Sequence, residues 1–178
     1  MAACRKPKAN YEDSVLQLDT FLPYRLNVVT QAVSQGLAAL YSVEFGISVP
    51  EWRILAALGQ KRAGNGAEWP GMTARDLALH GRMSKVMVSR AAASLLQRKM
   101  IAKRANRNDR RETFLRLTNK GETIYAAIVP RARAFQALLE DGITARDAQA
   151  FDRVIQHLLQ RAEAADAILF DNCETCHK

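Results

Sequence analysis

The sequence lacks the features that mark several classes of protein. It has no run of about 18 apolar residues, the length of a transmembrane helix, and its basic, polar N-terminus has no apolar signal segment. The motifs of zinc proteases, α/β-hydrolases, phosphate loops and dinucleotide-binding folds are missing, and His80, His157 and His177 form no evident constellation. We therefore expect a cytoplasmic protein that is not an enzyme and needs no cofactor.

Cysteine is scarce, because Cys4, Cys173 and Cys176 are the only three and all lie near the chain ends, which argues against a disulfide-stapled fold. The last two belong to Cys173-Glu174-Thr175-Cys176-His177, which has the C-x-x-C-H spacing of covalent c-type haem attachment. That attachment normally requires export, and one such motif leaves a zinc site short of a fourth protein ligand. We interpret residues 171–178 as a flexible tail. A haem- or metal-binding redox protein is the alternative from another functional class.

Positive charge is concentrated in one region of the chain. Residues Arg82 to Lys120 include twelve Lys or Arg and only two acids, Asp109 and Glu112, a local balance of +10 in a chain of net charge +8. Everything outside this region therefore sums to −2. A polyanion is the partner that best accounts for charge concentrated in this way, and nucleic acid is the polyanion we expect.

The spacing of apolar and capping residues predicts six helices and one β-hairpin. The first helix spans Phe21 to Phe45 and ends at Gly46, and the second follows Ser48 and ends before a glycine-rich loop at 62–71. The other helices are expected at Thr73 to Gly81, Ser84 to Lys99, Thr118 to Asp141 and Thr144 to Phe170, with strands at Met100 to Arg104 and up to Thr118. A short helix, a glycine-containing turn, a basic helix and a hairpin together predict a mainly α winged helix-turn-helix fold.

The first and last long helices both carry apolar stripes that one winged domain cannot easily bury. We therefore expect a homodimer in which these helices pack together, with two recognition helices about 34 Å apart on palindromic DNA. The expected organisation is a flexible N-terminal arm (1–17), a dimerisation helix (18–46), a winged helix-turn-helix DNA-binding domain (47–121), C-terminal dimerisation helices (122–170) and the tail (171–178).

The hairpin and the helix before it resemble the multiple-antibiotic-resistance regulator (MarR) family of bacterial transcription factors. The pattern D-x-R-x-x-x-L-x-L-T-x-x-G is met at Asp109, Arg111, Leu115, Leu117, Thr118 and Gly121, and the order of elements matches from about residue 20 to 168. One departure is Met100, which stands where the family usually has a glycine after the basic pair that ends the recognition helix. Met100 therefore predicts a different helix end or modest strain.

The N-terminal half of the fourth helix should enter the major groove. The guanidinium of Arg90 suits a forked contact with O6 and N7 of guanine, which is worth ~1–3 kcal/mol of discrimination. Among Val86, Met87 and Val88, one or two can touch a thymine methyl while the others anchor the helix, and Val88 fits either role. The helix residues that we expect at DNA are Ser84, Lys85, Met87, Val88, Ser89 and Arg90.

For the hairpin, the expected roles follow from the resemblance. It implies that Arg111 enters the minor groove and that Asp109 braces this arginine through a fork-to-carboxylate contact. Arg107 and Arg110 are expected to contact phosphates.

The resemblance also implies a small effector between the dimer helices and the winged domain, whose binding releases DNA from a repressor. Arginines beside aromatic residues suit an aromatic carboxylate or its CoA thioester. Regulation of efflux or stress genes that answer to phenolic compounds or antibiotics is the alternative. A core role for Trp52, and structural ion pairs for the arginines, are the competing interpretations. The candidate effector residues are Tyr24, Arg25, Trp52, Arg53, His80 and Tyr125.

Overall fold

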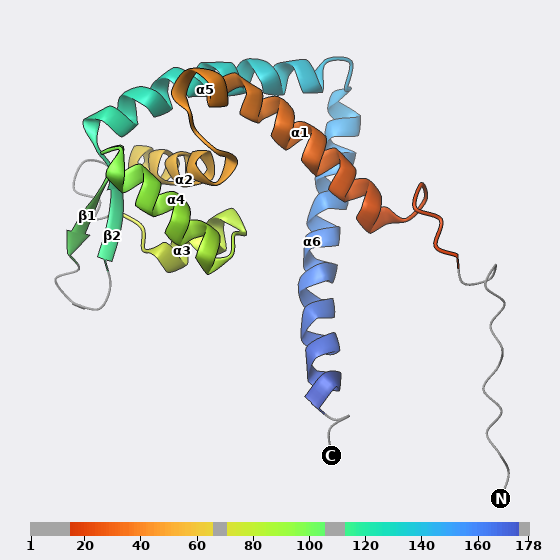
Figure 1. Ribbon diagram of the computed structural model, residues 1–178. Coiled ribbons are helices and arrows are strands. Elements are labelled where there is room, and N and C mark those ends of the chain that lie inside the picture. Colours follow the sequence, from red (N-terminus) through yellow and green to blue (C-terminus); the bar gives the residue numbers. More distant parts are fainter. Residues whose placement is uncertain (1–14, 66–70, 106–112, 175–178) are drawn as a thin grey trace, which may run out of the picture. The chain divides into compact units, whose positions relative to one another are not determined.

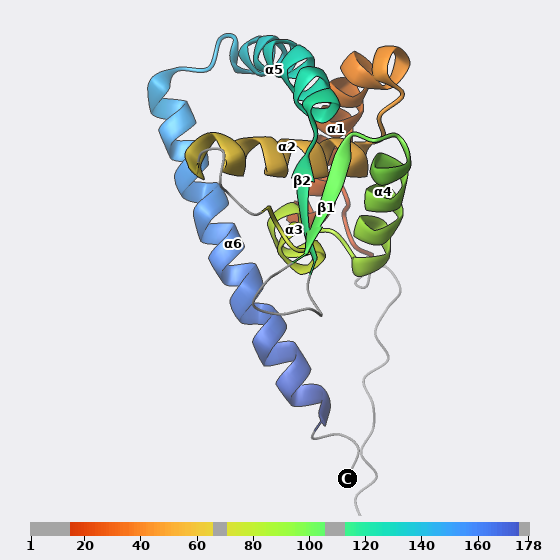
Figure 2. The same ribbon diagram turned by 90° about the vertical axis from the view of Figure 1, so that its left-hand side faces the viewer.

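The computed structural model describes residues 15–65, 71–105 and 113–174. The elements are α1 (Leu22–Phe45), α2 (Val49–Asn65), α3 (Ala74–Gly81), α4 (Lys85–Gln97), β1 (Ile101–Ala105), β2 (Thr113–Leu117), α5 (Asn119–Glu140) and α6 (Ala145–Glu174), as Figures 1 and 2 show. The chain divides into two compact units, one up to Ala134 and one from Phe135. The predicted fold class, mainly helical with one small antiparallel sheet, is confirmed.

Most helices begin where short polar side chains can satisfy their first backbone N–H groups. Thr73 and Asp76 form a reciprocal capping box at the start of α3, and the Ser84 hydroxyl accepts the Met87 N–H at 3.2 Å at the start of α4. The Thr118 hydroxyl accepts the Gly121 N–H at 3.1 Å at the start of α5. These starts therefore agree with the predictions from the sequence.

Two helices extend further than predicted. Helix α2 continues through Arg62 to Asn65 where a loop was expected, and an ion pair between Arg62 and Glu122 of α5 anchors this additional turn. Helix α6 continues to Glu174, so residues 171–174 are helical where the tail was expected to begin at residue 171. Its sequence has no glycine or proline after residue 145 that would end the helix earlier.

The backbone at the end of α4 shows how this helix ends with Met100 at the position where the MarR family usually has a glycine. Lys99, not Met100, adopts the left-handed conformation (φ 57°), and the N–H groups of Lys99 and Met100 donate to the carbonyls of Leu96 and Leu95. This is the Schellman arrangement of a helix end, with Lys99 in the position that glycine favours. Met100 itself is buried beside Leu95 in the core, so the helix ends normally without the expected glycine.

The core of the first unit joins α2 to the helix-turn-helix pair. Ile54, Leu55 and Leu58 of α2 are fully buried together with Leu77 of α3 and Leu95 of α4. Each of these side chains contributes roughly 1.5–3 kcal/mol when it leaves water. Since α3 and α4 share this core with α2, all three helices are held in one rigid arrangement.

The sheet extends this core toward the wing. Ile101 pairs with Leu117 and Lys103 pairs with Leu115 in the antiparallel register of β1 and β2. Met72, just before α3, exchanges two backbone hydrogen bonds with Leu115, of 3.0 and 2.8 Å. The sheet is therefore tied to the helix-turn-helix on one side, while Lys103 and Arg104 of β1 and Arg116 of β2 are exposed.

Many large apolar side chains remain exposed outside this core. In α1 most of them lie along the first half of the helix and Val43 lies in its last turn. In the second unit they lie on the last turns of α5, on the connection and on α6. No helix among the described residues is both long and apolar enough to cross a membrane. The exposed apolar residues are Leu22, Tyr24, Leu26, Val28, Val29, Val33 and Val43 of α1, and Leu138, Leu139, Ile143, Phe151, Val154 and Leu159 of the second unit.

Candidate nucleic-acid interface

Helix α4 presents one face to the core and the opposite face to solvent. Val88, Ala91, Ala92 and Leu95 are buried and recur at three- and four-residue spacing, which defines the inner face. Ser84, Lys85, Met87, Ser89 and Arg90 are exposed, so five of the six predicted helix contacts are accessible to a partner.

The sixth prediction, Val88, is wrong. Its side chain is 1% exposed and belongs to the core cluster, so it has no surface to offer to a base. Val86 is 59% exposed and is therefore the accessible valine of this helix, next to the partly accessible Met87. Between the two roles that the sequence left open, the structure assigns anchoring to Val88 and exposure to Val86.

Two further residues complete the outer face of α4. Ala93 and Gln97 are exposed and follow Val86 and Arg90 along the helix at spacings of three and four residues. The small Ala93 leaves room for close approach, and an amide such as Gln97 can pair with adenine through two hydrogen bonds. The sequence reasoning missed both, although the helical period counted forward from Arg90 would have found them.

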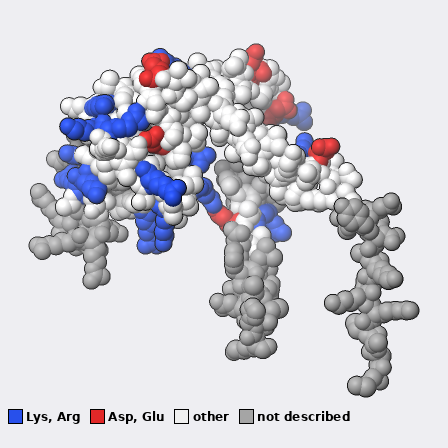
Figure 3. Space-filling view, viewed as in Figure 1, with Lys and Arg blue, Asp and Glu red and all other residues white. Residues whose placement is uncertain are grey.

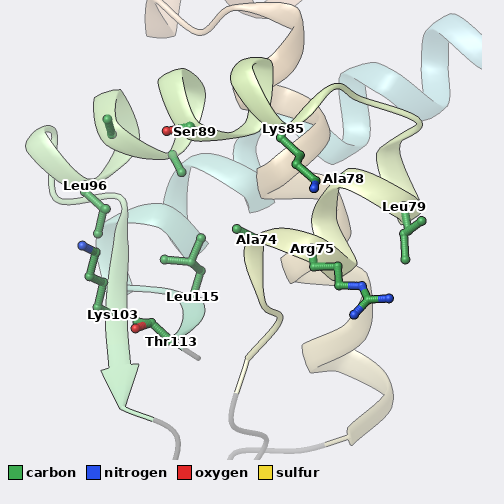
Figure 4. A pocket seen from close by; sticks show the side chains of 12 residues that line it. Ala74, Arg75, Ala78, Leu79, Lys85, Ser89, Leu96, Lys103, Thr113 and Leu115 are labelled. Carbon is green, nitrogen blue, oxygen red and sulfur yellow. The ribbon is translucent and has the colours of Figure 1, made fainter. Parts of the chain in front are cut away.

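A groove of about 840 Å³ lies between α3, α4 and the sheet, as Figure 4 shows. Its floor is apolar, with Ala78 and Leu96 among its residues, and its wall includes Ser89. Three cations line it: Arg75 from α3, Lys85 from α4 and Lys103 from β1. Arg75 and Lys103 were not predicted as site residues, because only the fold brings them beside Lys85.

Basic side chains gather on the face that carries α3, α4 and the sheet (Figure 3). Besides the groove cations, Arg90 of α4, Arg104 of β1 and Arg116 of β2 are exposed. Such clustering raises the local concentration of a polyanion and favours contacts with phosphates. The predicted wing residues Arg107, Asp109, Arg110 and Arg111 lie outside the described residues.

A second, smaller cavity of about 290 Å³ brings together three of the predicted effector residues. Trp52, Arg53 and His80 all line it, with Gln60 on its wall. Trp52 is 9% exposed and its ring lies 5.5 Å from that of Tyr41. Trp52 is therefore a core residue and at the same time a residue of the cavity wall.

The other predicted effector residues are not part of this cavity. Tyr24 and Arg25 lie on the first turns of α1, are exposed and do not line it. The ring of Tyr125 stacks on Trp52 at a centroid distance of 6.0 Å, so it contacts a residue of the cavity wall without lining the cavity itself. Within the described part of the chain, no cluster of His, Cys, Asp and Glu could hold a metal ion. The C-x-x-C-H motif extends beyond the described side chains.

Comparison with known proteins agrees with this architecture. The sequence model of the MarR family matches residues 45–112, which run from the last residue of α1 to the residue before β2. No curated protein sequence matches the chain. A MarR family transcriptional regulator from Silicibacter pomeroyi DSS-3 is 26% identical, with a TM-score of 0.67 over 83% of this chain and 99% of that one.

Two further solved structures show the same fold at lower identity. MepR from S. aureus, in a complex with DNA, is 17% identical with a TM-score of 0.69 over 79% of this chain and 98% of that one. PcaV from Streptomyces coelicolor, in a complex with its natural ligand, is 17% identical with a TM-score of 0.66 over 83% of this chain and 98% of that one. The sequence model of the MarR family thus matches the central part of the chain, and the chain has the winged helix-turn-helix fold of the solved MarR family transcriptional regulators.

Proposed function

We propose that this chain binds a palindromic DNA operator as a homodimer and represses transcription until a small aromatic carboxylate, or its CoA thioester, releases it. The observation that carries the DNA-binding part is the outer face of α4, where Arg90 stands exposed beside the basic groove. A helix with a buried inner face and an exposed polar outer face, set next to a basic surface, has the form needed to enter a major groove.

Each exposed residue of this face has a role that its chemistry supports. Arg90 reads guanine through its guanidinium fork, and Val86 with Met87 packs against thymine methyl groups. Ser84, Ser89 and Lys85 contact phosphates or base edges, while Arg75 and Lys103 bind phosphates along the groove. The wing roles of Arg107, Asp109, Arg110 and Arg111 remain predictions from the family pattern.

The homodimer is supported by apolar side chains that stay exposed in both units. Seven large apolar residues of α1 lie in water in the isolated chain, as do six of the second unit. Burying such residues against a second copy gains roughly 25 cal/mol for each Å² of apolar surface. A symmetric partner would cover these surfaces and present two copies of α4 to a palindrome.

The effector is supported by the chemistry of the small cavity. Arg53 offers a forked donor for a carboxylate, Trp52 an aromatic wall and His80 a further polar contact. About 290 Å³ is close to the lower limit of ligand sites, roughly 300 Å³. A single aromatic ring with its acid therefore fits better than a larger antibiotic. The acyl group of a CoA thioester would enter the cavity, and the nucleotide part would remain outside.

The deciding experiment selects duplexes from a random library with the full-length protein, then measures binding by fluorescence anisotropy at several salt concentrations. We expect a two-fold symmetric operator whose affinity exceeds that for random DNA by about 10³-fold or more. Titrating the complex with aromatic acids and their CoA thioesters should release the DNA. If the selection yields no preferred sequence, the operator function is refuted. Release only by phenolic compounds without a carboxylate would instead support control of efflux or stress genes.

A further inference from the structure

A buried carboxylate connects three helices next to the candidate DNA surface. Glu51, in the first turn of α2, is 5% exposed. Its Oε2 accepts hydrogen bonds from the Ser48 N–H at 2.7 Å and from the Ser48 hydroxyl at 2.8 Å. Its Oε1 accepts the hydroxyl of Ser94 on α4 at 2.6 Å. Glu51 thus joins the start of α2 to the recognition helix.

Arg98 adds the end of α1 to the same network. Its Nη1 lies 3.5 Å from Oε1 of Glu51 and donates to the Gly46 carbonyl at 2.9 Å. Its Nη2 donates to the Phe45 carbonyl at 2.5 Å. These two carbonyls lie at the end of α1, where helical hydrogen bonding leaves acceptors without partners. A single guanidinium, on the residue that caps the end of α4, therefore also caps α1 and lies near the carboxylate of Glu51 on α2.

The network holds a charged group in the interior because every part of it is satisfied. Burial disfavours the ionised form of Glu51, but the hydrogen bonds from Ser94 and Ser48 and the positive charge of Arg98 outweigh this effect, and the pKa of Glu51 is lowered. A half-satisfied network would cost more than an apolar one. Its geometry is therefore sensitive to the loss of any single partner.

The position of Ser94 links this network to base recognition. Ser94 lies four residues after Arg90, about one helical turn along α4 and on a neighbouring line of the same helix. When Glu51 holds the Ser94 hydroxyl, α4 cannot rotate about its axis without breaking that bond. The direction in which Arg90 projects is consequently set from α2, although Glu51 itself is buried away from solvent.

We propose that Glu51, Ser94 and Arg98 are positioning residues for operator binding, which fix the rotation of α4 and transmit displacements of the α1–α2 corner to it. The idea rests on the proposed DNA-binding function. The three residues work through α4, and the carboxylate of Glu51 reaches no DNA. The linkage provides a physical route by which a displacement of the Phe45 and Gly46 carbonyls, which Arg98 holds, would alter DNA affinity.

The test compares Ser94→Ala with Ser94→Thr, and Glu51→Gln with Glu44→Gln, in the full-length protein. Threonine keeps the hydroxyl that alanine removes. Glu44 is an exposed glutamate of α1 that pairs with Arg131 of α5 and makes no contact with α4 in the described hydrogen bonds and ion pairs. Anisotropy measures the ratio of affinities for the selected operator and for a random duplex, and circular dichroism confirms that each variant is folded at the assay temperature.

Ser94→Ala and Glu51→Gln should lower the operator-to-random ratio by about tenfold, while affinity for random DNA stays unchanged. Ser94→Thr and Glu44→Gln should keep the wild-type ratio. A folded Ser94→Ala or Glu51→Gln protein with the wild-type ratio overturns the proposal. If Glu51→Gln fails to fold, the Ser94 pair decides the question alone.

A second measurement does not depend on any operator. Hydrogen exchange should become faster in Glu51→Gln both in the last turn of α4 and in the last turn of α1, because the network holds both ends. Faster exchange confined to α2 would overturn the coupling even if DNA binding were established. Conversely, a wild-type protein without a preferred sequence but with coupled exchange would refute the regulator function and leave the linkage intact.

Discussion

Gly59 of α2 faces the phenol ring of Tyr125 on α5, and a Cβ built on this glycine would lie 2.6 Å from the ring carbons Cε1 and Cζ. The same ring stacks with Trp52 at a centroid distance of 6.0 Å, which restricts its movement. The close approach of α2 and α5 therefore depends on the missing side chain at residue 59. Because Trp52 lines the small cavity, the packing of Tyr125 between α2 and α5 also affects the position of this residue in the cavity wall.

The first prediction concerns two glycines of the same helix. Gly59→Ala should lower the free energy of unfolding by about 1–3 kcal/mol, because the overpacked methyl group outweighs the better helix propensity of alanine. Gly64→Ala is the matched control, since no atom lies within 4 Å of its built Cβ. It should stabilise the protein by about 0.5–1 kcal/mol. Urea unfolding of both variants measures these signs, and a stabilised Gly59→Ala protein would contradict the packing.

The second prediction concerns two valines of α4. Val88→Ala should lower the free energy of unfolding by about 2–3 kcal/mol, because it leaves a cavity in the core. Val86→Ala should change this free energy by less than about 0.5 kcal/mol, since the side chain is exposed. Its effect should instead be a weaker preference for thymine at one operator position. Equal destabilisation by the two substitutions would show that α4 is rotated from the orientation described.

The elements of this fold could be predicted from the sequence because their signals are local. A capping side chain and the N–H group that it satisfies are three residues apart, as at Thr73 and Ser84. The ends of α2 and α6, which the sequence analysis placed too early, depend on other signals. The last turn of α2 is stabilised by Glu122, which is distant in sequence. The extra length of α6 follows from the absence of a residue that breaks it.

The site was predicted less completely, because exposure depends on the fold. Val86 and Val88 are the same residue type two positions apart, and only the neighbouring core decides which one faces water. Glu51 and Ser94 are separated by 43 residues, so no local pattern indicates their hydrogen bond. Pairs of adjacent aromatic and basic residues occur at both Tyr24 and Trp52, and of these two pairs the second lines the small cavity and the first does not.

The third prediction concerns how the contribution of Glu51 to stability changes at acidic pH. The pKa of Glu51 is lowered from 4.5 in the folded chain, so the unfolded chain binds its proton more readily. The stability that this carboxylate contributes is present above pH 4.5 and is lost as the pH falls through the lower folded value. Glu51→Gln should therefore be less stable than the wild type at neutral pH, and the difference should shrink below pH 4.5. Urea unfolding from pH 7 to pH 3 measures this difference; a constant gap would contradict it.

The fourth prediction separates the two candidate effector arginines. Arg53→Ala should raise the concentration of aromatic carboxylate needed to release operator DNA by about tenfold or more, the usual effect of losing a charged hydrogen bond. Arg25→Ala should leave it unchanged, because Arg25 does not line the cavity. Anisotropy titration of each protein–operator complex gives both values. A reversed result would move the effector site to the first turns of α1.

The fifth prediction tests the pose of α4 on DNA. Arg90→Ala should lose about 1–3 kcal/mol of discrimination at one base pair of the operator, because the guanidinium fork to guanine is removed. Arg133→Ala removes the same charge from an exposed position of α5 and should leave base preference intact. Binding is measured at one salt concentration to operators substituted at each position in turn. A loss of discrimination at one base pair shows that Arg90 reads a base, whereas a uniform loss of affinity shows only the loss of its charge. If Arg90→Ala keeps the wild-type preference at every position, then Arg90 does not read a base and the outer face of α4 is not the surface that enters the groove.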